Sequence, residues 1–457
     1  GRRIENSGRA KRWAAESSSG AAPRRGRPLT TYRAGEDCTR PCLTFKRRIP
    51  QSGAGATRAA GAAKTLVLDL AGAAAKGTDP AAAARAVAEG AVLGAYRFTA
   101  YRTKPPEGRL RQAVVVTAER AAVAAGSRAA EAACVARDLV NEPGGSLTAP
   151  VLADRAAELS AAAGVECTVH DETSIRQLGL GGLIAVNQGS THPARFVELA
   201  YEPPDATDST PTIALVGKGI TFDAGGLSIK TAEGMAAMKS DMGGAAAVIG
   251  AMSALADMEA TVRVRGYLPM TDNMLGGDAM RVGDVIRHYG GSTTEVLNTD
   301  AEGRLLLGDA IAYATEEREG NRRPDAVVDL ATLTGACMVA LGTRTAGLMS
   351  NGDVLADEVL AAAARAGEPV WRLPLPDVEK RRLESKVADR KNTGHRYGGA
   401  IHAALFLRDF VPNGVPWAHL DIAGPAFNEE TDDADIPAGG TGFGVRTLPE
   451  LLSGRSQ

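Results

Sequence analysis

The residues best suited to chemistry form two acidic groups, and each group follows an apolar run typical of a β-strand. The first group contributes Asp223 and Asp241, and the second contributes Asp300, Glu302 and the guanidinium of Arg304. In an open α/β sheet, ligands bind outside the carboxyl ends of the strands, where both groups are expected to lie. Carboxylates without a nearby histidine suit one or two divalent cations. A pair of such metals is a known device for hydrolysis.

The segment 298–305 also has a simpler interpretation. Thr299 or Asp300 could cap the helix predicted after it, and Glu302 could stabilise the first turn of that helix. From this segment alone, the two interpretations are equally well supported. Other catalytic motifs do not fit: residues 217–219 lack the Walker A pattern, and there is no His-Glu-x-x-His zinc motif. The histidines are scattered, which favours surface or core positions over metal ligation.

Three segments around these residues resemble the signature segments of the leucyl aminopeptidase family, also called cytosol aminopeptidases: 218–230, 238–244 and 298–305. Further segments resemble that family in the same order along the chain: 331–336, 370–375, 388–393, 417–424 and 442–446. The resemblance extends from about residue 129 to 452, and a weaker similarity to the family's N-terminal domain begins near Lys64. Ala224 stands where a serine is expected, and because alanine is small we expect a minor effect.

The resemblance implies five metal ligands. Lys218 and Asp241 would hold a second metal, Asp300 would hold a first, and Asp223 and Glu302 would contribute to both. A lysine must be neutral to coordinate a metal, which an adjacent dication could enforce. Without the resemblance, an ion pair with Asp223 or Glu302 would be the preferred interpretation of Lys218. The expected cofactors are two divalent metal ions per subunit, Mn²⁺ or Zn²⁺.

The resemblance also implies roles in catalysis and substrate binding. Lys230 would bind the developing oxyanion. Arg304 would hold a bicarbonate that acts as general base, since a guanidinium binds a planar oxyanion bidentately; an ion pair one turn back along the helix is the alternative. The substrate would be bound by a strand-end segment and an apolar wall: Thr332, Leu333, Gly335 and Met238. The implied activity is a metal-dependent aminopeptidase that releases N-terminal leucine and other apolar residues from peptides.

Length and composition limit the remaining possibilities. A chain of 457 residues predicts roughly two to three domains, and 44% hydrophobic content supports a full core. The net charge of -2 argues against general affinity for nucleic acid. No apolar run reaches the roughly 18 residues of a membrane span, and no signal peptide is visible. Scattered cysteines fit a reducing compartment, so we expect a cytoplasmic protein, and the resemblance implies a homohexamer.

The pattern of the chain predicts three regions. Residues 1–63 form a basic low-complexity tail, expected to be disordered. Residues 64–128 are expected to form a reduced N-terminal α/β domain, with a connector helix to about residue 140, and residues 129–457 the catalytic domain. In the latter, strands near 212–217, 261–268, 294–297 and 325–331 alternate with helices near 242–257 and 304–317. This rhythm predicts an α/β fold with a mostly parallel sheet flanked by helices.

Three other functions are compatible with the sequence. An amidohydrolase could use Ser228 and Lys230, although their spacing is not Ser-x-x-Lys, and insensitivity to chelators would reveal it. A family member could act as a DNA-binding regulator through the tail 1–63, which salt-dependent DNA binding would support. The chain could also be an inactive product with a truncated N-terminal domain.

Overall fold

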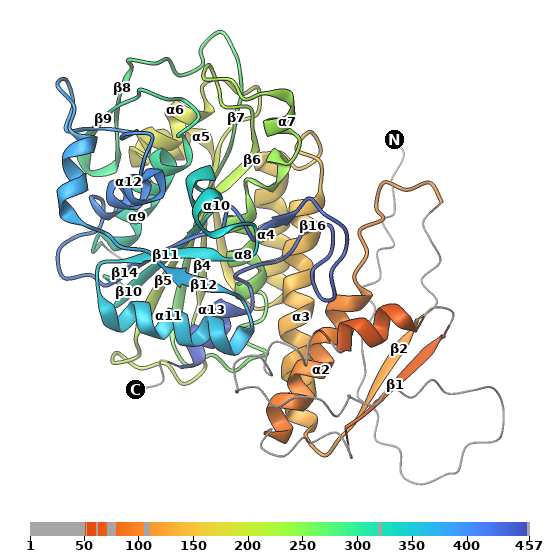
Figure 1. Ribbon diagram of the computed structural model, residues 1–457. Helices are drawn as coiled ribbons and strands as arrows, with labels where there is room; N and C mark the ends of the chain where they lie inside the picture. The colour runs from red at the N-terminus through yellow and green to blue at the C-terminus, as the bar shows by residue number, and fades with distance from the viewer. Residues whose placement is uncertain are drawn as a thin grey trace, which may run out of the picture. The chain divides into compact units, whose positions relative to one another are not determined.

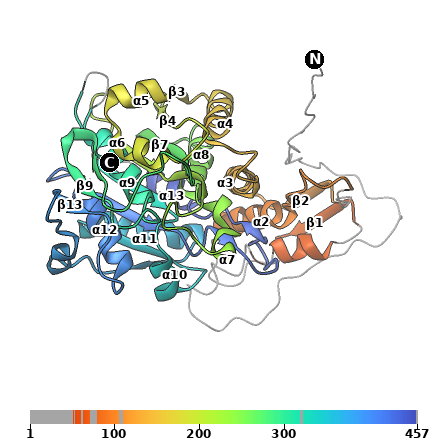
Figure 2. The same cartoon turned by 90° about the horizontal axis from the view of Figure 1, so that it is seen from above.

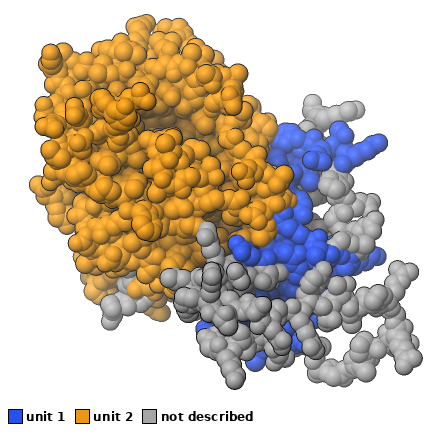
Figure 3. Space-filling view, viewed as in Figure 1, with its two compact units in different colours: residues 1–130 blue, residues 131–457 orange. Residues whose placement is uncertain are grey.

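The computed structural model describes residues 51, 53–60, 63–70, 79–104, 110–318 and 322–454 of the chain. Two compact units divide the chain, residues 1–130 and residues 131–457 (Figure 3). Across the described residues, no helix combines the length and the apolar character needed to cross a membrane.

The first unit contains a small α/β arrangement. β1 (Thr65–Asp69) and β2 (Gln112–Val116) form a two-stranded parallel sheet, and α2 (Pro80–Ala95) lies between them in the chain, while α3 (Arg120–Asn141) follows β2. The side chain of Asp79 accepts hydrogen bonds from the backbone N–H groups of residues 81 and 82, which caps α2. The buried core of this unit is formed by Ala56, Leu66, Leu68, Val87 and Ala91.

Regular structure in this unit begins before Lys64. Residues 53–59 are helical, and Ala54 and Ala56 are buried. A Cβ atom at Gly94 would lie 2.6 Å from the Cα atom of Ala54, so α2 approaches this helix too closely for a side chain at that position. The predicted tail therefore includes a folded helix near its end, while residues 1–50 of the tail lie outside the described residues.

The second unit is built on a nine-stranded sheet. Its strand order is β12, β11, β14, β10, β5, β7, β4 and β3, and β6 pairs with β7. In that order the strands span Val370–Arg372, Ala346–Ser350, Trp417–Asp421, Ala326–Ala331, Thr212–Gly217, Arg263–Asn273, Arg195–Tyr201 and Glu166–His170, with β6 at Gly219–Asp223. Five strands, β14, β10, β5, β7 and β6, run parallel to one another. On the two sides of this group, β11 is antiparallel to β14, and β4 is antiparallel to both β7 and β3. The helix-flanked α/β sheet predicted from the sequence is confirmed, with its parallel strands in the middle of a mixed sheet.

Helices cover both faces of this sheet (Figure 1). The central strand β5 is buried at every residue. Its Ala214 and Val216 join the core formed with α9 (Gly303–Thr315) and α12 (Gly399–Arg408). On the opposite face, a Cβ atom at Gly217 would lie 2.8 Å from the Cα atom of Ala245 in α8 (Gly243–Met252). Burial on both faces explains why this strand is a continuous apolar run rather than an alternating one.

The remaining elements connect and flank the sheet. The helices are α4 (Ala149–Ala162), α5 (Glu172–Leu178), α6 (Gly181–Asn187), α7 (Ala232–Met235), α10 (Gly335–Leu341), α11 (Asp353–Ala366) and α13 (Thr447–Ser453). Short 3₁₀ turns are η1 (Met238–Ser240), η2 (Tyr289–Gly291) and η3 (Asp377–Leu383). α4 and α5 lie against β3 and β4 (Figure 2). A minor sheet contains β8 (Val285–Arg287), β9 (Thr293–Glu295) and β13 (Arg390–Lys391), and β15 (Phe427–Asn428) pairs with β16 (Gly439–Gly440).

β7 is longer than its predicted counterpart, which ends near residue 268. On one side, β7 pairs with β5 up to Tyr267 and with β6 from Met270 onward. Pro269 lies in β7 at this change of partner strand. A proline is excluded from a continuous central ladder, but it is tolerated at such a break. The strand therefore continues to Asn273, which reaches the site described below.

Candidate active site

Four parallel strands end at one edge of the sheet and carry the site. Lys218 lies between β5 and β6, Asp223 ends β6, Asn273 ends β7 and Thr332 follows β10. Two loops complete the site: residues 238–241 precede α8, and residues 296–302 precede α9. This edge is where an α/β sheet is expected to bind its ligand.

Lys218 is the buried centre of the site, with 2% of its surface exposed. Its Nζ atom lies 2.8 Å from Asp241 Oδ1 and 3.0 Å from Glu302 Oε1, and it donates a hydrogen bond of 3.0 Å to the carbonyl oxygen of Thr332. Burial lowers the pKa of Lys218, but the surrounding carboxylates outweigh burial and raise it. A Cβ atom at Gly303 would lie 2.5 Å from Lys218 Cε. The start of α9 therefore has room for the Lys218 side chain only because residue 303 is a glycine.

Lys230 binds a second pair of carboxylates. Its Nζ atom lies 2.9 Å from Asp223 Oδ2 and also pairs with Asp300 Oδ1. Its side chain keeps 18% of its surface exposed, so this amine borders solvent where Lys218 does not. Burial lowers the pKa of Lys230, and the neighbouring carboxylates again raise it.

The four predicted carboxylate ligands are brought together. One oxygen from each of Asp223, Asp300 and Glu302 lies within 4.8 Å of the others, and Asp241 joins them through Lys218. Burial raises the pKa values of Asp241, Asp300 and Glu302, that of Asp241 to about 8. Among the described residues, Asp241 Oδ2 and Glu302 Oε2 are buried without a hydrogen-bond partner. Two lysines face four carboxylates, so this donor set fits additional positive charge from hard divalent cations.

Arg304 lies in the first turn of α9 and is 7% exposed. Its Nη1 atom donates a hydrogen bond of 2.8 Å to the carbonyl oxygen of Asn392, and its buried Nε atom has no partner within the described part of the chain. Burial lowers the pKa of Arg304 to about 10. Asp300, the residue one turn earlier, pairs with Lys230 instead.

The predicted substrate-binding residues lie on two sides of Asp241. Thr332 Oγ1 donates a hydrogen bond of 2.7 Å to Asp241 Oδ1, and Leu333 N donates one of 3.3 Å to Asp421 Oδ1. Gly335 is the exposed first residue of α10, and Met238 is the partly buried first residue of η1.

Polar residues outside the predicted ligand set hold these loops in place, and among them the sequence analysis missed Asn273 and Asp421. Asn273 Nδ2 donates to Asp223 Oδ1 at 2.8 Å and to the carbonyl oxygen of Thr299 at 3.0 Å. Ser228 and Thr299 form a reciprocal pair, because each backbone N–H donates to the other's hydroxyl, at 2.7 and 3.1 Å. Asp421 accepts a hydrogen bond of 2.6 Å from the hydroxyl of Thr334. A strand read through to residue 273 would have indicated Asn273, since it ends beside β6.

Three histidines occupy core positions beside carboxylates. His288 Nδ1 lies 2.9 Å from an oxygen of Asp309, and His419 Nδ1 lies 2.5 Å from an oxygen of Asp329. The Nε2 atom of His402 lies 3.1 Å from Glu379. Each of these three buried imidazoles therefore has a carboxylate partner.

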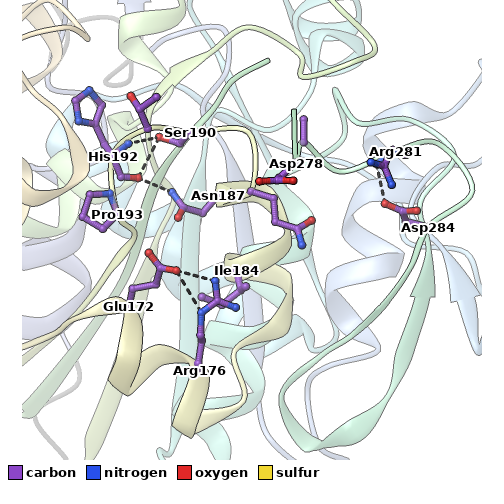
Figure 4. Close-up of a pocket in the computed structure, with 13 residues that line it drawn as sticks. Glu172, Arg176, Ile184, Asn187, Ser190, His192, Pro193, Asp278, Arg281 and Asp284 are labelled. Carbon is purple, nitrogen blue, oxygen red and sulfur yellow. Dashed lines mark hydrogen bonds and ion pairs between the residues drawn. The ribbon is translucent and has the colours of Figure 1, made fainter. Parts of the chain in front are cut away.

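A polar pocket of about 560 Å³ lies elsewhere in the second unit, between α5, α6 and the loop that follows β7 (Figure 4). Within it, the guanidinium of Arg176 pairs with Glu172, and the backbone N–H of Arg281 donates to Asp284. None of the predicted site residues lines it. The predicted site residues therefore lie at the sheet edge and not in this pocket.

The family of the chain follows from comparison with known proteins. The catalytic domain model of the cytosol aminopeptidase family matches residues 134–449, and the N-terminal domain model of that family matches residues 46–105. The chain belongs to the cytosol aminopeptidase family. It is therefore an aminopeptidase, as the resemblance predicted. The N-terminal match begins ahead of Lys64, where similarity was expected to begin.

Relatives of this aminopeptidase cover most of its length. A probable cytosol aminopeptidase of Aquifex aeolicus is 45% identical over 80% of this chain and 74% of its own. One of Micrococcus luteus is 47% identical over 88% of this chain and 81% of its own. A solved structure described as the bottromycin maturation enzyme BotP in complex with Mn has a TM-score of 0.86 at 53% identity, covering 90% of this chain and 88% of that one. A mutant of tomato leucine aminopeptidase has a TM-score of 0.81 at 34% identity, covering 91% and 80%.

Proposed function

We propose that this chain releases N-terminal amino acids from peptides, with a preference for leucine and other apolar residues, by means of two divalent metal ions, Mn²⁺ or Zn²⁺. The observation that carries the proposal is the buried carboxylate cluster, in which oxygens of Asp241 and Glu302 lack a partner among the described residues. The related enzyme BotP has been solved in complex with Mn, which supports the choice of metal.

Five residues would hold the metals. Lys218 and Asp241 would bind one ion, Asp300 the other, and Asp223 and Glu302 both. When bound, two such ions lower the pKa of a water between them and supply a nucleophile near neutral pH. Lys218 can join this set only as a neutral amine, and in the structure its carboxylate neighbours favour the ammonium form. Metal uptake should therefore release a proton from the protein.

Two cationic residues would act on the substrate. The amine of Lys230 is preorganised by Asp223 and Asp300 and borders solvent, so it can donate to the oxyanion that develops at the scissile carbonyl. Among the residues that the structure describes, the buried Nε atom of Arg304 has no partner, which suits a planar oxyanion such as bicarbonate that would serve as general base. The contacts of Lys230 with carboxylates, rather than with Ser228, favour this mechanism over an amidohydrolase that uses a Ser–Lys pair.

The remaining residues would position the peptide. Thr332, Leu333 and Gly335 follow β10 and would align its backbone, and Met238 would form an apolar wall for the first side chain. We also propose a homohexamer in the cytoplasm, on the strength of the family resemblance. Nucleic acid is not an expected partner, because the net charge is -2.

The specificity is tested with a panel of aminoacyl anilides that differ only in the first side chain. We expect leucine and methionine anilides to be cleaved with a higher kcat/KM than glycine, aspartate and lysine anilides. Met238→Ala should reduce the leucine preference, since removing apolar contact from such a pocket changes discrimination by about 10–200-fold at most. Equal rates across the panel would contradict the apolar preference.

A second candidate function is the maturation of a peptide natural product. It rests on the description of the similar structure BotP as a bottromycin maturation enzyme, at 53% identity; a probable cytosol aminopeptidase of Chlorobaculum tepidum is also 53% identical, over 321 residues. A maturation enzyme should discriminate among peptides by residues beyond the first. Peptides that share N-terminal leucine and vary at the next three positions would separate the two functions, because a general aminopeptidase should cleave them at similar rates.

A further inference from the structure

Asn392 is fully buried and directs its hydrogen-bonding groups toward one segment of the site. It follows β13 and has 0% of its surface exposed. Its backbone N–H donates to Glu295 O at 3.0 Å, and its carbonyl oxygen accepts from Arg304 Nη1 at 2.8 Å. Its partners in the described part of the chain lie between residues 295 and 304.

The side-chain amide makes the remaining contacts. Its Oδ1 atom accepts from the backbone N–H groups of Leu297 at 2.8 Å and Asn298 at 3.3 Å. Its Nδ2 atom donates to the carbonyl oxygens of Asn298 at 2.6 Å and Ala301 at 3.3 Å. A primary amide can accept twice and donate twice, so the full capacity of this side chain is used on the backbone of the loop 297–301.

We infer that Asn392 is a positioning residue: it fixes the loop before α9 so that Asp300, Glu302 and Arg304 face the site together. The expected effect of this residue on metal binding and activity rests on the proposed function. Residues 296–302 form neither a helix nor a strand, so their backbone groups need partners from elsewhere in the fold. Asn392 supplies such partners and also holds the guanidinium of Arg304.

The segment that carries Asn392 is itself held at a defined register. Ser385 Oγ donates to Glu295 Oε2 at 2.6 Å, and Asp389 Oδ2 accepts from both the N–H and the hydroxyl of Thr293, at 2.7 and 3.0 Å. β13 pairs with β9 directly after Asp389, and Asn392 follows β13. A residue supported in this way can impose its geometry on the loop rather than follow it.

The test compares Asn392→Asp with the matched control Asn428→Asp. Asn428 is also buried, and its amide donates to two carbonyl oxygens, of Thr431 and Pro437, and accepts from Glu430 N. Both substitutions replace two donors by a carboxylate oxygen that faces carbonyl oxygens. Mn²⁺ affinity and stoichiometry are measured by calorimetry on metal-depleted protein, together with kcat, KM and the exchange of backbone amide hydrogens.

We expect Asn392→Asp to weaken Mn²⁺ binding by about 10–100-fold, the range for residues that orient metal ligands. Its kcat should fall more than its KM rises, and excess Mn²⁺ should restore part of the activity. Asn428→Asp should keep Mn²⁺ affinity within about twofold of the wild type even if its Tm falls, as expected of additive effects at a site outside the ligand network. A folded Asn392→Asp variant with wild-type affinity and stoichiometry would overturn the inference.

Amide exchange separates this inference from the proposed function. In metal-free protein, Asn392→Asp should speed exchange at residues 297–304, and Asn428→Asp should not. Unchanged exchange would overturn the positioning role whatever the metal content, whereas a wild-type protein that binds no Mn²⁺ would overturn the proposed function alone. If Asn392→Asp does not fold, Asn392→Ser, which keeps one donor and one acceptor, is measured in the same way with the same expected directions.

Discussion

Replacing Lys218 by methionine should destabilise the metal-free protein strongly. Methionine has a similar length and no charge, so the substitution leaves Asp241 and Glu302 buried without the ammonium that lies 2.8 and 3.0 Å from them. Removing one partner of a buried ion pair costs about 3–5 kcal/mol in the free energy of unfolding. The second unit spans roughly 330 residues. Dividing this free-energy cost by the average unfolding entropy of a unit of that size gives a Tm decrease of about 4–7 °C.

Calorimetric melting of metal-depleted wild type and Lys218→Met measures this effect. Lys239→Met is the matched control, because it removes a lysine amine that has no carboxylate partner of this kind in the described part of the chain. Lys239 lies in η1, and its amine donates a hydrogen bond of 2.7 Å to the carbonyl oxygen of Asn141. The Tm of this control should fall by no more than about 2–4 °C, the scale of one hydrogen bond from a charged donor, about 1.5–3 kcal/mol. Excess Mn²⁺ should raise the Tm of Lys218→Met less than that of wild type if Lys218 is a ligand. A metal-free variant that melts with the wild type would refute the ion-pair account.

Three further outcomes follow from the same geometry. Lys230→Ala should lower kcat by about 10²–10³, the range for losing one oxyanion donor, while elemental analysis still finds both metals; near-wild-type kcat would contradict its role. Asp300→Asn and Glu302→Gln should lose metal and activity together, and retention of full metal content would exclude them as ligands. Asp329→Asn should cost more stability at pH 6 than at pH 9 in urea denaturation. Burial lowers the pKa of His419, but the negative charge of Asp329 outweighs burial and raises this pKa in the folded protein. The pair therefore contributes its full stabilisation below the unfolded-state pKa of about 6.5, and this contribution is lost as the pH rises through the folded-state pKa of His419.

The sequence predicted the helix-flanked sheet and placed the candidate acidic residues after the ends of strands. β5 is an almost continuous apolar run that ends at a polar loop, so the position of Lys218 and Asp223 at the sheet edge followed from the pattern. The parallel middle of the sheet followed from the alternation of strands with helices, but the strand predicted near 294–297 lies in the minor sheet as β9 and not in the main sheet. The pattern did not predict the antiparallel strands at the sides, because the connections between strands, and not their composition, decide strand direction.

The sequence did not predict which residues contact the candidate site residues. Asn392 lies about ninety positions from the loop it holds, and the strand that delivers it, β13, has two residues. Asn273 was hidden because Pro269 ends the apparent strand four residues earlier. The pairing of Lys218 with Asp241 depends on how η1 turns back toward β5, which tertiary packing decides.

The central claim is that hydrolysis depends on two metal ions held by this cluster. The most direct measurement titrates metal-depleted protein with Mn²⁺, and in parallel with Zn²⁺, while following hydrolysis of a leucine anilide and measuring bound metal per chain. We expect no hydrolysis without metal, full activity at two ions per chain, and easier loss of the ion on the side of Asp300, which lacks the Lys218 amine. Hydrolysis that persists in the presence of chelator, or full activity with one ion per chain, would contradict the claim.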